Sequence, residues 1–502
     1  LRDPGCIGRA CRGSGAVRCG AICVPAMSHS SASSSLLARS LAAVWHPCTQ
    51  MQHHLESGAN ALPLVPVVRG QGVWLYDDAG NRFFDGISSW WTNLFGHANP
   101  RINAALREQL EQLEHVMLAG FTHEPVVALS ERLSAQTGGA LGHAFYASDG
   151  ASATEIALKM SFHYWQNMGL SAKRRYVCVA GSYHGETVGA LAVTDVALFK
   201  NAYGPLTQPA FVVPSPDARQ AQPGETGADV AWRAAQALEQ LLAREHTQIA
   251  ALIVEPLVQC AGGMAMHDPA YLVQARALCD RYQVHLIADE IAVGFGRTGT
   301  FFAHEQAVAD GVAIRPDFLC LSKGITGGYL PLSVVLSSDA VYQAFLDERL
   351  ARGFLHSHSY TGNPLACRAA LATLDIFASD NVITANRATA AALTDLLRPL
   401  AEHPRVRHMR QRGMIWAADV DTADPGFGRR FYREALVRGV LLRPLGHTLY
   451  IMPPYIATQD ELAWLATRAA QALDAALADG ETVQAARPVA SSGEAAAPTF
   501  AA

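Results

Sequence analysis

The chain has 502 residues, 50% of them hydrophobic and 17% charged, a globular composition with room for about two or three domains. Its net charge is −5 and it has no arginine-rich run or basic stripe, so we expect small-molecule partners and no nucleic acid. The sequence has no uncharged apolar stretch of roughly eighteen residues and no apolar signal core, so we expect no membrane span and a cytoplasmic location.

Residues 1–40 are rich in glycine, serine, arginine and cysteine and show no hydrophobic period, so we expect them to be disordered. The cysteines in this stretch match no common zinc-site spacing, and we expect no metal there. Several later cysteines lie in apolar segments typical of reduced cores: Cys178, Cys260, Cys279, Cys320 and Cys367.

Residues 41–97 form the next stretch of the chain. Within them, residues 67–86 show the alternation and turn residues of a short strand pair. The run SSWW follows and contains Trp90 and Trp91. Core packing explains either tryptophan as well as a binding role does.

Residues 143–165 predict a strand, a polar turn and a helix, because apolar residues recur at helical spacing after the turn. Gly150 and Ala151 stand at the start of that helix, where free N–H groups and the positive dipole end favour a phosphate. Tyr183 follows the next strand, at a place where an aromatic ring could stack on a planar cofactor. Glu255 ends another buried strand, and we interpret it as a structural residue paired with an arginine.

Residues 284–288 form an apolar run that predicts a buried strand, with Asp289 at its carboxyl end. A second apolar run ends at Lys323, 34 residues later (323 − 289), which leaves room for one helix and one strand. Both side chains are expected at one crevice. Pyridoxal 5′-phosphate needs this pair, a lysine for its Schiff base and a carboxylate that keeps its pyridine nitrogen protonated.

After Lys323 the chain continues through the run FLHSHSYTGNPLAC, residues 354–367. A metal site at His356 and His358 lacks an obvious third ligand, so we expect none. Arg443 follows an apolar strand, where a guanidinium can form a rim salt bridge or bind a carboxylate substrate. Residues 481–502 are rich in alanine, serine and proline, and we expect them to be disordered.

These stretches together resemble the class III, fold-type-I pyridoxal-phosphate aminotransferases, from about Trp45 to about Gly480. The resemblance implies an α/β fold with a mostly parallel sheet in a large domain, residues 98–370. A small α+β domain would come from both chain ends, residues 41–97 and 371–480. It also implies a homodimer, in which the hydroxyl of Ser359 reaches the partner's cofactor phosphate.

The resemblance further implies roles for particular residues. Lys323, Asp289 and Tyr183 would be catalytic. The cofactor would be held by Gly150, Ala151, Tyr183, Asp289, Lys323, His358 and Ser359. The substrates would be bound by Trp90, Tyr183, Lys323, Ser357, Arg443 and Cys48. Many relatives have serine where Ala151 stands, so Ala151 offers only its backbone N–H.

His46-Pro47 and the double tryptophan resemble one branch of the family, which acts in biotin synthesis. That branch implies S-adenosylmethionine as amino donor and 8-amino-7-oxononanoate as acceptor. Cys48 departs from it, because those relatives carry a tyrosine that stacks on the donor's adenine, and lysine is therefore an alternative donor. A general ω-amino-acid:pyruvate aminotransferase and a catalytically silent pyridoxal-phosphate-binding protein are the other hypotheses.

Overall fold

The computed structural model describes residues 35–57 and 61–485, which fall into two compact units. The first unit contributes helix α1 (Leu36–Ala43), and the chain from Trp45 onward belongs to the second. Helix α1 corrects part of the expectation of disorder, because the Ser35 side chain accepts a hydrogen bond from Ala38 N and caps a run rich in leucine and alanine. The rest of that expectation, and the early cysteines, lie outside the described residues.

A seven-stranded sheet forms the core of the second unit, with strand order β4-β14-β13-β10-β7-β5-β6. Strand β14 is antiparallel to both neighbours and the remaining pairs are parallel, so the predicted mostly parallel sheet is confirmed. The strands are β4 (His143–Ala147), β5 (Arg175–Val179), β6 (Phe211–Val213), β7 (Ile249–Val254), β10 (His285–Asp289), β13 (Phe318–Leu321) and β14 (Ser333–Ser337).

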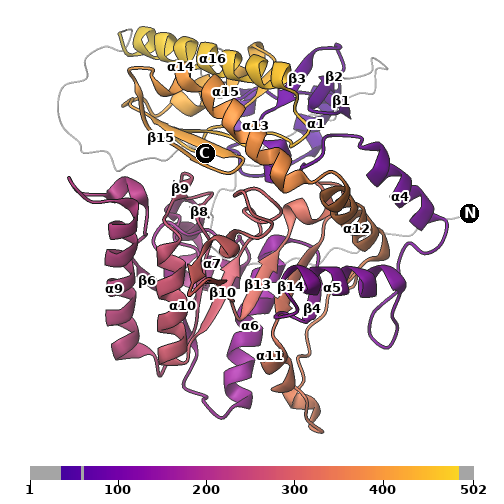
Figure 1. Ribbon diagram of the computed structural model, residues 1–502. Coiled ribbons are helices and arrows are strands. Elements are labelled where there is room, and N and C mark those ends of the chain that lie inside the picture. Colours follow the sequence, from indigo (N-terminus) through magenta and orange to yellow (C-terminus); the bar gives the residue numbers. More distant parts are fainter. Residues whose placement is uncertain (1–34, 58–60, 486–502) are drawn as a thin grey trace, which may run out of the picture. The chain divides into compact units, whose positions relative to one another are not determined.

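Helices cover both faces of this sheet, which explains why its central strands are continuous apolar runs (Figure 1). Along β7, Ala251 and Ile253 pack in one apolar cluster, whereas Leu252 and Val254 pack in another. The first cluster contains α6 (Gly150–Asn167). The second contains α4 (Pro100–Leu110), α5 (Glu124–Gln136), α9 (Gly227–Glu245), α10 (Ala270–Tyr282) and α12 (Pro364–Ser379).

The second unit also has a four-stranded and a three-stranded sheet, and the four-stranded sheet combines strands from both ends of the unit. One has the order β1-β2-β3-β17 and the other β15-β16-β18. Strand β17 pairs with β3 in parallel, with Val440 opposite Phe84, so segments far apart in sequence share one sheet. The strands are β1 (Val67–Gln71), β2 (Trp74–Asp77), β3 (Arg82–Asp85), β15 (Val406–Arg412), β16 (Ile415–Val420), β17 (Val440–Leu441) and β18 (Thr448–Ile451).

The connection from Asp289 to Lys323 differs from the prediction. It holds no α-helix but the 3₁₀ helix η4 (Ala303–Gln306) and a small hairpin before β13, because glycines interrupt the chain after β10. The short elements are α2 (Gln52–Leu55), α3 (Ser88–Trp91), α7 (Val188–Val193), α8 (Ala197–Lys200), α11 (Asp339–Gln343), α14 (Arg398–Ala401), η2 (Asn201–Leu206), η3 (Ala218–Gln220), η5 (Lys323–Thr326), η6 (Leu350–Arg352), β8 (Val258–Gln259), β9 (Ala265–Met266), β11 (Val308–Ala309) and β12 (Val312–Ala313).

Three further helices pack with the smaller sheets: α13 (Val382–Leu396), α15 (Phe427–Val437) and α16 (Gln459–Ala485). Helix α16 runs a few residues into the tail expected to be disordered, because alanine, glutamate and glutamine are good helix formers. The remainder of that tail lies outside the described residues. Among the helices that the structure describes, none has the length and apolarity to span a membrane. The boundaries expected near residues 97, 370 and 480 remain predictions.

Candidate active site

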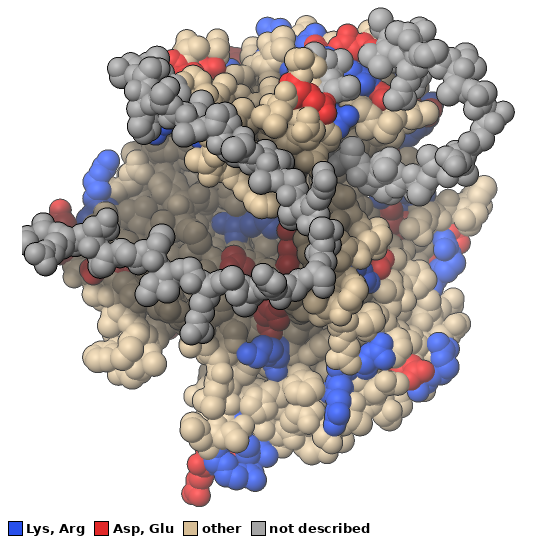
Figure 2. Space-filling view, turned by 180° about the vertical axis from the view of Figure 1, so that it is seen from behind, with Lys and Arg blue, Asp and Glu red and all other residues tan. Residues whose placement is uncertain are grey.

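The candidate active site lies at the carboxyl ends of the parallel strands. Strands β4, β5, β7, β10 and β13 point the same way, so the loops that follow them meet at one edge of the sheet. These loops line a cavity of ≈ 330 Å³ that contains Tyr183, Glu255, Asp289 and Lys323. The face seen in Figure 2 is hollowed, and acidic and basic side chains both lie within the hollow.

Lys323 comes directly after β13 and opens η5. Its Nζ lies 5.1 Å from the centre of the Trp91 ring. Burial lowers the pKa of the Lys323 amine, and the negative charge of Asp289 works against that shift. Desolvation therefore raises the share of neutral, nucleophilic amine at a given pH.

Asp289 ends β10 and is held by two donors. His184 Nδ1 lies 2.7 Å from Asp289 Oδ2, and Ile291 N donates to Oδ1 at 3.1 Å. Both side chains of the pair are buried, and His184 Nε2 has no partner among the described residues. His184 has no role predicted from the sequence, although its contact in the structure fixes the orientation of the Asp289 carboxylate.

Glu255 lines the same cavity, and its predicted pairing with an arginine is wrong. Its carboxylate accepts hydrogen bonds from Tyr183 N at 3.0 Å and from Cys260 N at 2.9 Å, because the loops after β5 and β7 lie side by side here. Burial raises the pKa of Glu255 to about 7, with His184 opposing and Asp289 reinforcing the shift. The cavity therefore holds a carboxyl group that titrates near neutral pH.

The amino end of α6 forms a tight cradle at one side of the cavity. Asp149 caps this 18-residue helix by accepting from Ser152 N at 2.9 Å. A Cβ on Gly150 would lie 2.8 Å from Ile291 Cγ2, and one on Gly185 would lie 2.5 Å from Ala151 Cβ. Glycine at both positions lets the neighbouring loops close around the helix start, where an anion is favoured.

Glu186 is a second cavity residue that the sequence analysis missed. The Tyr183 hydroxyl donates to Glu186 Oε1 at 2.9 Å, and Cys48 Sγ lies 3.9 Å from the same oxygen. Burial, followed by the charge of Glu186, raises the pKa of both Tyr183 and Cys48. The only sequence signal for this contact is that Glu186 comes directly after the run Tyr183-His184-Gly185.

Arg443 contacts two other residues predicted to bind substrate, Trp90 and Cys48. Its guanidinium carbon lies 5.6 Å from the centre of the Trp90 ring, and its Nη2 donates to the backbone oxygen of Cys48 at 3.0 Å. Trp90 keeps 42% of its surface exposed, whereas Trp91 is buried. Core packing alone therefore explains neither tryptophan: Trp90 is exposed beside Arg443, and the buried Trp91 lines the cavity beside Lys323.

The segment that contains Ser357, His358 and Ser359 does not line this cavity within the described chain. His356 lies 3.1 Å from His358 between their Nε2 atoms, and Lys159 Nζ lies 2.7 Å from His356 Nδ1. Within residues 35–57 and 61–485, no group of histidine, cysteine and acidic side chains is arranged to hold a metal ion. The contact of Lys159 with His356 also disfavours a cation at this histidine pair.

A mostly parallel sheet with a lysine, a carboxylate and a helix amino terminus at its carboxyl edge defines an enzyme of the pyridoxal-phosphate type. The model of the family "Aminotransferase class-III" matches residues 56–473, and the chain belongs to this family. The chain is thus an aminotransferase.

Similar proteins agree with this assignment. The chain is 44% identical to the adenosylmethionine-8-amino-7-oxononanoate aminotransferase of Helicobacter pylori, over 85% of this chain and 95% of that protein. The crystal structure of the enzyme of that name from Methanocaldococcus jannaschii superimposes with a TM-score of 0.81 at 32% identity, over 88% and 98% of the two chains. An amine transaminase from an uncultivated Pseudomonas species, in its PLP-bound form, has a TM-score of 0.78 at 31% identity, over 87% and 99%.

Members of this family use pyridoxal 5′-phosphate, and the residues at the cavity fit that cofactor. The glycine cradle at α6 suits its phosphate, and the buried Asp289 carboxylate suits a protonated pyridine nitrogen. Lys323 lines the same cavity and would supply the amine that such a cofactor requires. The residues at the cavity therefore fit pyridoxal 5′-phosphate, the cofactor that the family implies.

Proposed function

We propose that the protein transfers an amino group from S-adenosylmethionine to 8-amino-7-oxononanoate, giving 7,8-diaminononanoate for biotin synthesis. The observation that carries this proposal is the cluster of Trp90, Arg443 and Cys48, which adjoins the lysine-bearing cavity through the contact of Cys48 with Glu186. The names of its relatives support the same reaction. A general ω-amino-acid:pyruvate aminotransferase is the second candidate, because an amine transaminase shares the fold.

Each residue of the cavity has a proposed role. Gly150 and Ala151 hold the cofactor phosphate with backbone N–H groups, and Asp289 keeps the pyridine nitrogen protonated. Tyr183 covers the ring and is itself fixed by Glu186 and Glu255. When bound, the cofactor supplies an electron sink for the carbon that carries the amine.

Lys323 acts as general base and general acid. Its Nζ removes the proton from the donor carbon next to nitrogen and later returns a proton to the former carbonyl carbon of the acceptor. The lowered pKa of the Lys323 amine makes its neutral form available for the first of these transfers. The two substrates are used in turn, which predicts ping-pong kinetics.

Arg443 binds the carboxylate of 8-amino-7-oxononanoate, for which a guanidinium offers a two-pronged fork. Trp90 lies beside Arg443 and supplies an aromatic wall that holds the donor, S-adenosylmethionine. Glu186 adds a carboxylate next to Tyr183 and Cys48, and it favours the positively charged S-adenosylmethionine in the same pocket.

The purified protein tests this assignment directly. Incubated with pyridoxal 5′-phosphate, S-adenosylmethionine and 8-amino-7-oxononanoate, it is expected to form 7,8-diaminononanoate, read by mass spectrometry. Two competing substrate pairs are tested in parallel. One has lysine as the donor and 8-amino-7-oxononanoate as the acceptor, and the other has ω-amino acids as donors and pyruvate as the acceptor. Faster turnover with lysine would overturn the donor assignment, and activity with ω-amino acids and pyruvate alone would favour the second candidate.

Replacing Cys48 with tyrosine is expected to improve use of S-adenosylmethionine. Aromatic stacking contributes about 0.5–1.5 kcal/mol, so kcat/KM for this donor should rise roughly twofold to tenfold at about 1.4 kcal/mol per decade. The acceptor's parameters should change less. Cys48→Leu adds bulk without an aromatic face, and an equal rise in that variant would contradict stacking as the cause.

The protein is also proposed to work as a homodimer in the cytoplasm. Buried, unpaired cysteines such as Cys178 and Cys320 are compatible with a reducing compartment.

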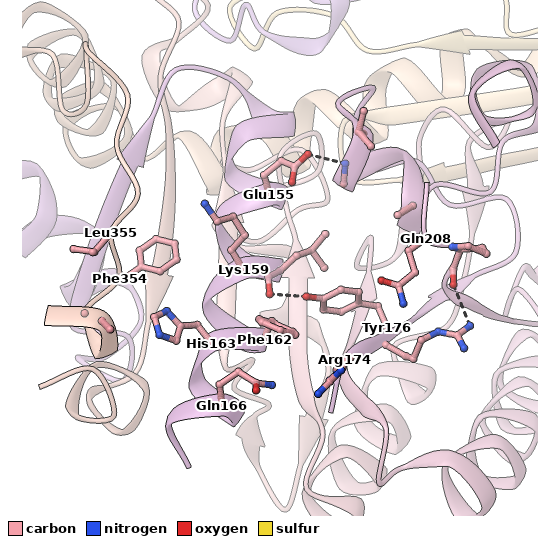
Figure 3. Close-up of a pocket in the computed structure, with 18 residues that line it drawn as sticks. Glu155, Lys159, Phe162, His163, Gln166, Arg174, Tyr176, Gln208, Phe354 and Leu355 are labelled. Atoms are coloured by element: carbon pink, nitrogen blue, oxygen red, sulfur yellow. Dashed lines mark hydrogen bonds between the residues drawn. The ribbon is translucent and has the colours of Figure 1, made fainter. Parts of the chain in front are cut away.

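A second cavity, of ≈ 750 Å³, lies beside α6. Figure 3 shows side chains of α6 flanked by Phe354 and Leu355 on one side and by Arg174 and Tyr176 on the other.

This second cavity fits a second copy of the chain. Leu355 is 69% exposed and Phe162 is 38% exposed, and Leu355 stands two residues before Ser357. A surface that continues into the Ser357–Ser359 segment is where a partner subunit would be contacted. Ser359 would then complete the partner's phosphate site.

Leu355→Glu is expected to shift the protein from dimer to monomer and to lower activity with it, because a charge is costly in an apolar contact. Sedimentation velocity measures the assembly. Val437→Glu, at a residue 75% exposed on α15, is the matched control and should remain dimeric. A fully active wild-type monomer would contradict the proposal.

A further inference from the structure

The turn that carries the two tryptophans has an uncommon backbone. Ser88, Ser89, Trp90 and Trp91 all have positive φ angles, of 51°, 46°, 71° and 72°. Left-handed conformation is unfavourable for residues with a side chain, and it normally occurs as single residues. A run of such residues persists only where the surrounding contacts enforce it.

Asp85 supplies much of that enforcement. It ends β3 with no exposed surface, and its Oδ1 accepts from Ser89 N at 2.8 Å. Its Oδ2 accepts from Ser89 Oγ at 2.7 Å and lies 3.0 Å from His97 Nε2. Asn93 Nδ2 lies 3.0 Å from His97 Nδ1, which leaves Nε2 as the nitrogen that donates to Asp85.

Two long-range contacts also hold the turn. Ser88 Oγ donates to Met452 O at 2.7 Å. The glycine turn after Lys323 packs against the residues that follow the turn, because a Cβ on Gly328 would lie 2.9 Å from Asn93 Cα. The segment that follows Lys323 therefore packs directly against the residues that follow the turn.

We propose that Asp85 is a positioning residue of the amino-donor pocket, which holds the turn Ser88–Trp91 so that Trp90 faces Arg443. The proposal deepens the proposed function and rests on its placement of the donor beside Trp90. Asp85 does not line the cavity itself, so it acts through the turn.

Asp85→Asn tests this role with little change in size. The amide oxygen can still accept from Ser89 N, but the amide nitrogen cannot accept from Ser89 Oγ and His97 Nε2. Asp77→Asn is the matched control, because Asp77 holds the turn between β2 and β3 by accepting from Asn81 N at 2.8 Å and Ala79 N at 3.1 Å. Asp77 and Asp85 lie at opposite ends of the β2–β3 hairpin.

The first measurement needs no cofactor. Near-ultraviolet circular dichroism of the cofactor-free protein reports how firmly tryptophan side chains are held. Asp85→Asn is expected to lose the part of the signal that Trp90→Phe also loses, while Asp77→Asn keeps it. A spectrum of Asp85→Asn identical to that of the wild type would overturn the proposal.

The second measurement is a double-mutant cycle on donor kinetics. Asp85→Asn is expected to raise the donor KM about tenfold, equivalent to about 1.4 kcal/mol, with a smaller change in kcat. In a Trp90→Ala background the same substitution should change donor kcat/KM by less than about twofold, because its effect passes through Trp90. The positioning role would be overturned if the effects of Asp85→Asn and Trp90→Ala on donor kcat/KM simply multiplied in the double variant. It would also be overturned if Asp77→Asn raised the donor KM as much as Asp85→Asn does.

Ser89→Ala covers the case in which Asp85→Asn does not fold. It removes only the Oγ bond to Asp85 and is expected to raise donor KM in the same Trp90-dependent way. An unchanged donor KM in Ser89→Ala would then count against the proposal. The preferred donor of the wild-type protein is measured first. If it is not S-adenosylmethionine, the proposed function is overturned. The mutant cycle is then run with the donor that the protein does use, and it still tests the role of Asp85.

Discussion

Replacing Lys323 with alanine is expected to abolish amino transfer. Lys323 is the lysine that lines the cavity with Asp289, and its pKa is lowered by burial as a proton-transferring amine requires. Borohydride reduction should attach the cofactor covalently to the wild-type protein and leave the variant unlabelled. Peptide mapping of the reduced wild type should place the label on Lys323.

Lys173→Ala provides a matched control for this experiment. Lys173 is also buried, and burial lowers its pKa to about 8, but its Nζ donates to the carbonyl oxygens of His246 and Ile249, well away from the cavity residues. The control should lose stability and keep its turnover per folded molecule. A Lys323→Ala protein that still forms a reducible lysine adduct would contradict the assignment.

Much of the fold could be predicted because its signals are local. The apolar runs that end at Asp289 and Lys323 are strands buried on both faces, and such runs mark a parallel sheet without reference to the rest of the chain. The connection between them was mispredicted, because its length alone does not distinguish a helix from a glycine-interrupted loop with η4.

The parts of the site that were not predicted from the sequence depend on contacts between loops. Glu186 meets Cys48 across 138 residues of sequence, and His184 meets Asp289 across 105. Neither pairing leaves a pattern in either segment by itself. Glu255 was assigned an arginine because buried carboxylates are usually paired, whereas backbone N–H groups satisfy it here.

The turn Ser88–Trp91 illustrates a different limit. Its residues have no intrinsic preference for positive φ, so local sequence predicts ordinary packing. The conformation is held by Asp85, four residues before Ser89, and by two tertiary contacts, those of Ser88 with Met452 O and of Asn93 with the glycine turn near Lys323. A segment where local preference fails in this way is expected at a functional site.

Asp289→Asn is expected to leave the cofactor bound and to slow amino transfer by several orders of magnitude. The amide keeps the shape of the carboxylate but removes the charge that holds the pyridine nitrogen protonated, so the electron sink is weakened. His184 Nδ1 would still find an oxygen acceptor in the amide, so the buried contact at 2.7 Å survives in altered form. Single-turnover rates with donor in excess measure the chemical step.

Glu290→Gln is the matched control for that charge removal. Glu290 is the next residue, is equally buried and is likewise paired with a histidine, with His304 Nδ1 at 2.7 Å from its Oε1. Its carboxylate also accepts from Ala303 N and His304 N, so it anchors the loop after β10 and does not line the cavity. The control should unfold at a lower temperature and transfer the amine at a near-normal rate. Near-normal single-turnover rates in Asp289→Asn would instead show that the carboxylate does not sustain the electron sink.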